Sequence, residues 1–227
     1  MTDDFLWVEP PRPTRGPKPS MSLERIADAA IAIADAEGPA AVSMQRVAAD
    51  LGFTKMSLYR YLPGKAELVA VMVERALGEP PVHSGDDWRD ALAGWARLLL
   101  DGYVRHPWTL AATVGPRPVG PREVGWTESA LAALAGTPLS RSERLDAIVL
   151  IVGHARMLAE QAASRQPEAQ LTAAFGLVVS EHRERYPELA AALLESTADS
   201  RDQAFEFGLA RILDGIEALI RSRSGRV

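Results

Sequence analysis

Residues 47–68 read VAADLGFTKMSLYRYLPGKAEL and contain the pattern that decides the fold. A short apolar helical segment is followed by Gly52, which permits a sharp turn, and by Thr54, which is placed to cap a second short helix. The pair Pro63-Gly64 ends that second helix. Two short helices joined by a glycine-containing turn form a helix-turn-helix, so the sequence predicts this motif over residues 43–62.

The second short helix is predicted to have an apolar face and a mixed, exposed face. Leu58 defines the inward direction, and at about 100° per residue Met56 and Arg60 point almost directly away from it. Hydrogen-bonding and apolar groups on one face can contact base edges and thymine methyl groups in a DNA major groove. The residues predicted to face the groove are Lys55, Met56, Ser57, Tyr59 and Arg60.

Another set of residues is placed to bind phosphates. Free N–H groups and the helix dipole favour an anion at a helix N-terminus, where several of these residues lie. The segment 44–65 also carries four basic residues against the single acid Asp50, although the whole chain has a net charge of −5. The predicted phosphate contacts are Ser43, Thr54, Tyr61 and Lys65, and the basic Arg46 is included among the DNA-binding residues.

Composition and patterning predict an all-α protein. The 227 residues are 47% apolar and rich in alanine, with few β-branched runs. Three regions are expected. Residues 1–21 form a flexible, proline-rich arm with a basic second half, residues 22–78 form the helix-turn-helix domain, and residues 79–227 form a larger helical domain.

Caps and apolar periodicity predict the remaining elements. The stretch GPRPVGPREVG (115–125) is expected to be a loop, and LDAIVLIV (145–152) is apolar nearly all round, which indicates burial on more than one side. Helices are expected from Ser22 to Gly38, over 65–77, 88–106 and 126–135, from a Ser140–Glu143 capping box to Ser164, on both sides of Pro187, and over 202–223.

Several classes of protein and site are excluded or disfavoured. The chain has no cysteine, so disulfides and thiolate metal sites are ruled out. No apolar run approaches the roughly 20 residues that span a bilayer, and the N-terminus lacks a signal-peptide pattern, so a cytoplasmic protein is expected. No H-E-x-x-H, P-loop or G-x-G-x-x-G motif is present, and the four histidines lack metal-ligand spacing. Neither a cofactor nor an enzymatic activity is expected.

Residues 22–77 resemble the DNA-binding domain of TetR-type bacterial transcriptional regulators. The resemblance rests on VAADLGFTKMSLYRYLPGKAEL and on the preceding helix with its Gly38. TRGPKPSMS, the loop near residue 120 and FEFGLARILDGIEALI (205–220) are similar to the subgroup whose C-terminal domain is like that of the tetracycline repressor. The chain departs from several members at Tyr61, where they carry histidine.

This resemblance implies a homodimer that binds a near-palindromic operator as a repressor and is released from DNA by a small molecule. The arm from Arg12 to Lys18 either reaches an adjacent minor groove or is a solvated tail. Residues that line a pocket, or equally pack in an ordinary core, are Trp95, Leu99, Tyr103, Trp108, Trp126, His154 and Met157. A dimer through 141–163 and 202–221 is predicted to use Val152, Ala155, Ala159, Gly208, Ile212, Gly215 and Leu219.

Two other functions fit the sequence. The first is a constitutive DNA-binding dimer without a sensor, which a C-terminal domain lacking a cavity would support. The second is a helical small-molecule-binding protein or enzyme that contains a helix-turn-helix-like subdomain. Replacement of Arg60 or Tyr59 by alanine distinguishes this second function from that of a DNA-binding regulator, because only a regulator is expected to lose affinity for DNA.

Overall fold

The computed structural model describes five stretches of the chain, namely residues 4–8, 21–82, 87–163, 165–195 and 203–225. Within these stretches the chain is α-helical with two short 3-10 helices and no strand, so the predicted fold class is confirmed. No helix in the described stretches is long and apolar enough to cross a membrane.

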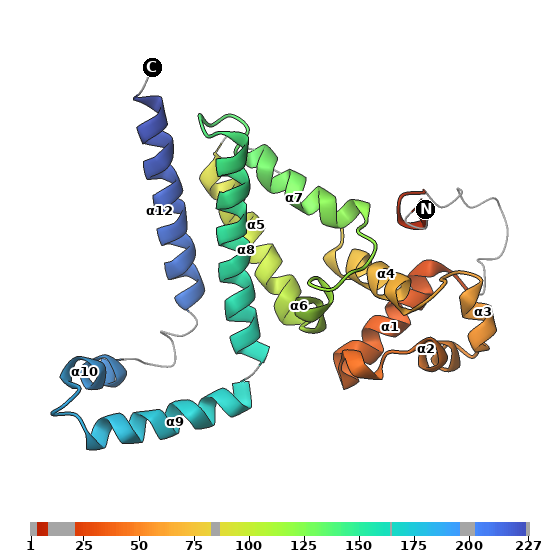
Figure 1. Cartoon of the computed structure of the whole chain (residues 1–227), viewed down its shortest axis with the longest axis horizontal. Helices are drawn as coiled ribbons and strands as arrows, with labels where there is room; N and C mark the ends of the chain where they lie inside the picture. Colours follow the sequence, from red (N-terminus) through yellow and green to blue (C-terminus); the bar gives the residue numbers. More distant parts are fainter. Residues whose placement is uncertain (1–3, 9–20, 83–86, 164, 196–202, 226–227) are drawn as a thin grey trace. The chain divides into compact units, whose positions relative to one another are not determined.

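Two compact units make up the chain, and Figure 1 shows their helices. Unit 1 comprises Met1–Ala91 and Asp101–Ala135, and unit 2 comprises Leu92–Leu100 and Gly136–Val227. Unit 1 therefore contains helices from both sides of residue 78. The division at residue 78 into a DNA-binding domain and a ligand-binding domain stays a prediction.

Helices α1 to α4 and Trp108 of α6 form a hydrophobic core in unit 1. Helix α1 packs against α2 and α4, and Leu58, Leu62 and Leu68 are fully buried among them. The elements of unit 1 are η1 (Asp4–Leu6), α1 (Leu23–Glu37), η2 (Pro39–Ala41), α2 (Met44–Asp50), α3 (Lys55–Tyr59), α4 (Lys65–Leu77), α6 (Trp108–Ala112) and α7 (Pro121–Ala133).

The predicted helix starts in this region are confirmed. The hydroxyl oxygens of Ser22, Ser43 and Thr54 each accept a hydrogen bond from the backbone N–H three residues later. Gly52 has a φ of 75°, which glycine adopts without the steric cost of a Cβ, and it makes the turn between α2 and α3. Local sequence therefore fixes the helix-turn-helix.

Two predictions for unit 1 are wrong. The described part of the N-terminal arm is not free, because Phe5 and Leu6 pack against the core and the Trp7 indole N–H donates to the Val119 carbonyl at 3.1 Å. Helix α7 begins at Pro121, inside the stretch expected to be a loop, with this proline at its first position. The basic residues Arg12, Arg15 and Lys18 lie outside the described residues.

In the described residues, unit 2 contains α8, α9, α10 and α12 together with the middle of α5. The predicted capping box at the start of α8 is confirmed, because the Ser140 N–H donates to the Glu143 carboxylate and the Glu143 N–H donates to the Ser140 hydroxyl. Helix α12 packs along α8. The elements are α5 (Trp88–Arg105), which runs through both units, α8 (Arg141–Ala163), α9 (Arg165–Glu181), α10 (Pro187–Glu195) and α12 (Ala204–Ser224).

In the single chain, helix α8 is buried on one side only, so burial of its apolar stretch on a second side stays a prediction. Ala147, Ile148 and Ile151 are buried, whereas Val149 and Leu150 are 67% and 60% exposed. Within one chain, the apolar stretch covers the core of unit 2 with one face and leaves the other face exposed.

Candidate nucleic-acid interface

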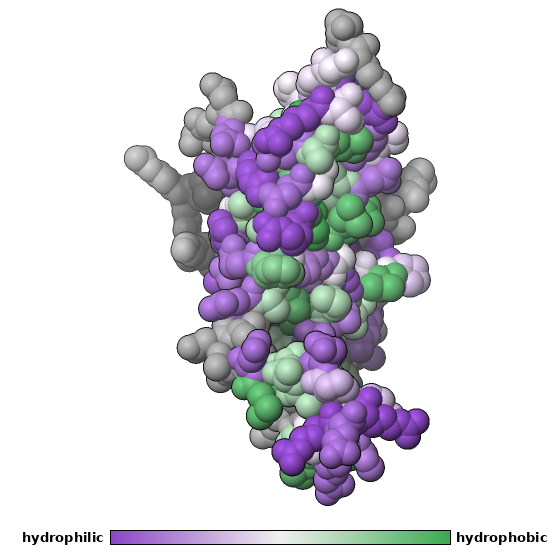
Figure 2. All heavy atoms as spheres, turned by 90° about the vertical axis from the view of Figure 1, so that its left-hand side faces the viewer, coloured by the Kyte–Doolittle hydropathy of each residue, from purple (hydrophilic) through white to green (hydrophobic). Residues whose placement is uncertain are grey.

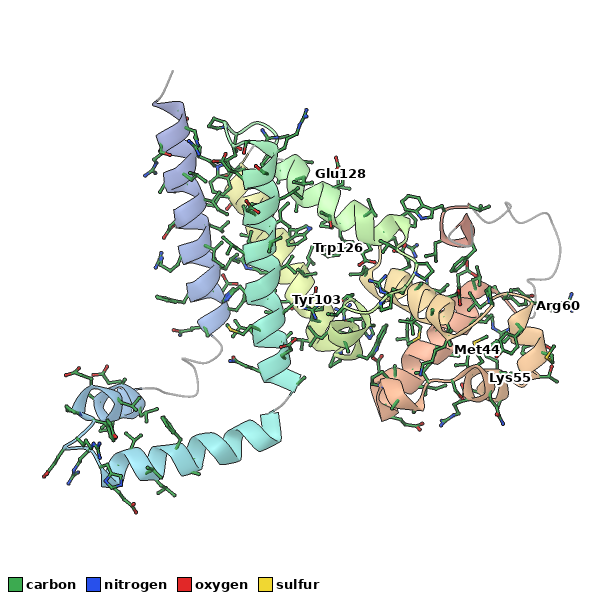
Figure 3. The ribbon with its side chains drawn as sticks, viewed as in Figure 1. Met44, Lys55, Arg60, Tyr103, Trp126 and Glu128 are labelled. Atoms are coloured by element: carbon green, nitrogen blue, oxygen red, sulfur yellow. The ribbon has the colours of Figure 1, made fainter. Side chains whose placement is uncertain are left out.

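Helix α3 is held by one buried residue and exposes most of the rest. The Leu58 side chain is fully buried, whereas Met56 is 73% exposed. Figure 3 shows the Arg60 side chain pointing away from the body of unit 1. The remaining predicted reading residues are exposed or half-buried: Lys55, Ser57 and Tyr59. The structure thus brings the five predicted reading residues together on and beside one short helix.

The basic residues on this surface differ from other basic residues of unit 1. Arg75 pairs with Asp28 at 2.8 Å, and Arg117 pairs with Glu123 at 2.7 Å. By contrast, Arg60 and Lys65 form no ion pair within the described stretches, and the Lys55 ammonium lies 5.4 Å from the centre of the Tyr59 ring. Cations without a carboxylate partner are suited to binding an external anion such as a phosphate.

Two predicted DNA-binding residues have partners within the chain. The Arg46 guanidinium makes two hydrogen bonds to the Glu37 carboxylate, at 3.0 and 2.7 Å, and thereby joins α2 to the end of α1. This pair holds the pKa of Glu37 below its ordinary value through its hydrogen bonds and charge. The Tyr61 hydroxyl donates to the Met21 carbonyl at 3.3 Å. Both side chains remain partly exposed.

The predicted phosphate-binding hydroxyls already cap helices. The Ser43 hydroxyl accepts from the Arg46 N–H at 3.1 Å. The Thr54 hydroxyl accepts from the Ser57 N–H at 3.3 Å and lies 2.9 Å from the Ser57 hydroxyl. A hydroxyl that caps a helix also retains capacity for another hydrogen bond, so capping and phosphate binding are compatible.

The candidate pocket residues of unit 1 are all buried. Trp108 belongs to the core that α1, α2 and α4 form, and its indole N–H donates to Asp35 at 2.8 Å. The Trp126 indole N–H reaches the Gly78 carbonyl at 3.4 Å, and Tyr103 is 7% exposed. Trp108 therefore packs as a core residue of unit 1.

The candidate pocket residues of unit 2 differ in their surroundings. Trp95 and Leu99 are buried, whereas Met157 is 49% exposed. The His154 ring stacks on Phe205 with 5.4 Å between ring centres, and its Nε2 lies 3.0 Å from the Phe205 carbonyl. Because a carbonyl only accepts hydrogen bonds, Nε2 carries the proton in this contact. His154 thus joins α8 to α12.

The candidate dimer residues fall into two groups. Ala155 and Ala159 are buried inside unit 2 and offer no surface to a second copy, and a Cβ on Gly208 would come within 2.3 Å of the His154 ring. These small residues allow α8 and α12 to pack closely within one chain. The others, which are exposed or half-buried, are Val152, Ile212, Gly215 and Leu219.

Local sequence patterns did not indicate the role of Glu74 or the exposure of the apolar residues of α8. The Glu74 carboxylate accepts hydrogen bonds from two backbone N–H groups at the start of α7. An acid near the end of α4 gives no local signal of this partner, which lies 48 residues away. The missed surface residues of α8 are Leu145, Val149 and Leu150.

Two family models match the chain. The model described as "Bacterial regulatory proteins, tetR family" matches residues 26–72. The model described as "Tetracyclin repressor-like, C-terminal domain" matches residues 80–220. The first match contains α2 and α3, and the second contains all of α5 to α10.

Similar proteins agree with these matches. The HTH-type transcriptional repressor DrrR1 of Streptomyces coeruleorubidus is 41% identical, over 99% of this chain and 87% of DrrR1. An HTH-type transcriptional regulator of Saccharopolyspora erythraea is 29% identical, over 82% of this chain and 80% of the relative. The Streptomyces coelicolor TetR family protein ActR, solved in complex with (S)-DNPA, has a TM-score of 0.72 and 25% identity, over 88% of this chain and 98% of ActR.

These matches cover the helix-turn-helix and the helical region that follows it, and they agree with the exposed, basic face of α3. The proteins concerned are regulators rather than enzymes. The chain belongs to the TetR family and is a helix-turn-helix transcriptional repressor of that family.

Proposed function

We propose that this repressor binds a near-palindromic operator as a homodimer, reads bases with the exposed face of α3, and releases the DNA when a small molecule binds its C-terminal region. The observation that carries the DNA-binding assignment is the surface of α3. One buried leucine anchors the helix, while Lys55, Tyr59 and Arg60 remain available to a partner. Arginine contacts guanine through two hydrogen bonds, and tyrosine and lysine bind bases or phosphates.

The phosphate contacts in this proposal surround the reading face. Lys65 begins α4, Thr54 caps α3 and Ser43 caps α2, so three helix N-termini carry polar side chains near the same motif. Helix N-termini and lysine favour phosphate oxygens. Tyr61 and Arg46 contribute through the parts of their side chains that stay exposed.

A gel-shift assay with the DNA upstream of the gene tests the DNA-binding part. Tyr59→Ala is expected to weaken binding while the melting temperature and oligomeric state stay unchanged, because Tyr59 is an exposed residue. The control is Tyr186→Ala, which removes a tyrosine of similar exposure from unit 2. Equal affinity of wild type and Tyr59→Ala would contradict the assignment of the reading face.

The dimer proposal rests on the exposed apolar face of α8. Leu145, Val149 and Leu150 are 47%, 67% and 60% exposed in a single chain. Figure 2 views the molecule from the side of α12 and α10, and apolar residues interrupt the hydrophilic surface there. A second copy that packs on α8 by two-fold symmetry would bury Leu145, Val149 and Leu150, and a two-fold dimer matches a two-fold operator.

Light scattering tests this dimer. Val149→Asp places a charge on the proposed interface and is expected to give a monomer at concentrations where wild type is a dimer. Val82→Asp is the matched control, since Val82 is 92% exposed in unit 1. A Val149→Asp chain that stays dimeric would show that the copies associate through another surface.

The effector proposal draws on a similar protein and on aromatic residues of this chain. ActR was solved in complex with (S)-DNPA, and this chain carries Tyr103 and Trp126 on helices of unit 1. Aromatic side chains bind flat organic molecules through stacking. The test adds a panel of polycyclic and antibiotic-like compounds to the preformed DNA complex. A compound that releases DNA supports the proposal, and a panel without effect supports a constitutive repressor.

A further inference from the structure

The methionines of this chain differ widely in their exposure to solvent. The chain has no cysteine, so methionine supplies all of its sulfur. In the described stretches, Met21, Met44 and Met72 are buried, at 5%, 6% and 2% exposed. Met157 of α8 is 49% exposed, and Met56 of α3 is 73% exposed. Because susceptibility to oxidation follows exposure, Met56 is the thioether of the described residues that an oxidant reaches most easily.

Met56 lies on the face of α3 that is turned away from the core. It is the second residue of the helix, and Leu58, two residues later, is fully buried. Residues two apart on a helix point about 200° apart, so the thioether and the Leu58 side chain lie on opposite sides. The Lys55 and Arg60 side chains project from the same short helix and its C-terminal end (Figure 3). The most accessible sulfur therefore lies within the surface proposed to read DNA.

Hydrogen peroxide oxidises a thioether by transferring one oxygen atom to it. The sulfur lone pair attacks one peroxide oxygen, the O–O bond breaks, and the second oxygen leaves as water. The sulfur loses two electrons and becomes a sulfoxide, while the peroxide gains two. The product is a polar side chain that accepts hydrogen bonds in place of an apolar one. Methionine sulfoxide reductases reverse the change with a dithiol, which becomes a disulfide as water is released.

A sulfoxide on this face is poorly matched to a DNA major groove. The groove presents acceptors at guanine N7 and O6, adenine N7 and thymine O4, and donors only at the amino groups of adenine and cytosine. The sulfoxide oxygen also only accepts, so it loses its hydration in the groove without a general replacement, and an apolar contact with a thymine methyl group is lost. The packing of Leu58 is untouched, because it lies on the other side of the helix. Oxidation should therefore weaken DNA binding and leave the fold intact.

We infer that Met56 is a redox-sensitive modification site, and that its oxidation by a peroxide to the sulfoxide releases the repressor from DNA without unfolding the helix-turn-helix. This inference rests on the proposed DNA-binding function. It adds a response to oxidant that acts directly on α3 and needs no molecule bound in the C-terminal region. Met157, the other exposed methionine of the described residues, lies in unit 2 and serves as an internal reference.

Graded peroxide treatment of the full-length chain tests this inference. Peptide mass spectrometry follows the oxidation of each methionine, and a gel shift follows affinity for a DNA duplex that the untreated chain selects from a random pool. Met56 is expected to be oxidised well before Met21, Met44 and Met72, and affinity should fall roughly tenfold as Met56 is converted. The melting temperature should stay unchanged. Treatment with both methionine sulfoxide reductases and dithiothreitol should restore the affinity.

Bound DNA gives a second measurement that requires no variant. If Met56 faces the groove, an excess of the selected duplex should slow its oxidation by peroxide. The oxidation rate of Met157 should stay the same with and without DNA, because this residue lies in unit 2. Equal oxidation rates of Met56 in free and DNA-bound protein would overturn the inference.

Two variants separate Met56 from the other methionines. Met56→Leu keeps an apolar side chain of similar volume but removes the sulfur that is oxidised. Met157→Leu is the matched control, because it removes the other exposed methionine. The affinity of each variant after peroxide is compared with its own affinity before treatment, so a change in starting affinity does not enter. Met56→Leu should keep its affinity, whereas Met157→Leu should lose affinity as the wild type does.

The outcomes separate the inference from the function on which it rests. The inference is overturned if Met56 is oxidised no faster than the buried methionines, if its oxidation leaves affinity unchanged, or if Met56→Leu loses affinity as wild type does. If the untreated wild-type chain selects no duplex, the proposed DNA-binding function fails instead. If Met56→Leu itself binds no duplex, the protection of Met56 by DNA and the recovery after reduction decide the question in wild type.

Discussion

Helices α3 and α7 begin in different ways. Thr54, the residue immediately before α3, caps it, and the exposed cations Lys55 and Arg60 have no carboxylate partner among the described residues. Glu74 caps α7 from another helix, and the arginines nearby pair with acids of the same unit. The start of α3 is therefore formed by neighbouring residues and exposes its cations, whereas the start of α7 is formed by a distant side chain and its arginines are paired.

Two substitutions in α3 should differ most in their effect on stability. Leu58→Ala is expected to lower the free energy of unfolding by about 2–5 kcal/mol, because the side chain is fully buried. Met56→Ala, at a position that is 73% exposed, should change it by no more than about 0.5 kcal/mol. Urea unfolding measures both, and similar losses would mean that α3 does not have separate packed and exposed sides.

The two caps should also differ in strength. Glu74→Ala is expected to cost about 2–3 kcal/mol of unfolding free energy, because two part-buried N–H groups lose a charged acceptor. Thr54→Ala removes one exposed hydroxyl cap and should cost about 1 kcal/mol. Thermal and urea unfolding of the two variants compare these costs. A smaller cost for Glu74→Ala than for Thr54→Ala would break the contrast between the two helix starts.

The same contrast explains what the sequence predicted. The caps at Ser22, Ser43, Thr54 and Ser140 act over three residues, so local patterns gave the helix starts correctly. The start of α7 needs an acceptor 48 residues away, so proline and glycine near residue 120 indicated a loop instead.

The candidate site residues also divide into those set by local sequence and those set by distant partners. The exposed residues of α3 follow from helical periodicity, and their predicted arrangement agrees with the structure. The ion pair between Arg46 and Glu37, and the packing of Gly208 on His154, join helices that are distant or separated by turns. Periodicity within one helix does not specify which neighbour covers a residue, so these partners were not predicted.

Salt dependence distinguishes open cations from paired ones. Lys65→Ala should lower the slope of log Kd against log salt by roughly 0.9, because one phosphate contact and its released counterion are lost. Arg75→Ala removes the same charge from α4, but Arg75 already pairs with Asp28, so its slope should match wild type. Fluorescence titration over a range of salt concentrations measures both slopes. Equal decreases in slope for Lys65→Ala and Arg75→Ala would contradict the distinction between the two cations.

Glu143 at the start of α8 combines a local cap with a distant partner, Arg223, and its replacement should have the smallest effect. The Ser140 N–H, then the Arg223 guanidinium and the Ser140 hydroxyl, lower the pKa of Glu143 from its ordinary 4.5 to about 2. A lowered pKa in the folded chain means that this stabilisation is present above pH 4.5 and is lost as pH falls toward about 2. Glu143→Gln should therefore flatten the pH dependence of the melting temperature in that range. An unchanged pH profile would contradict the stabilising role of the ionised Glu143 carboxylate.

The most direct test of α3 as the DNA-reading surface is the affinity of Arg60→Ala for a DNA duplex that the wild-type chain selects from a random pool, compared with wild type and Arg75→Ala at one salt concentration. Arg60→Ala is expected to weaken binding by about 1–3 kcal/mol, or roughly 5- to 150-fold, with melting temperature unchanged. Arg75→Ala is expected to bind within about twofold of wild type, because the Arg75 guanidinium already pairs with Asp28. Equal affinities for wild type and Arg60→Ala, or equal losses for the two arginine variants, would contradict the assignment of α3 as the DNA-reading surface.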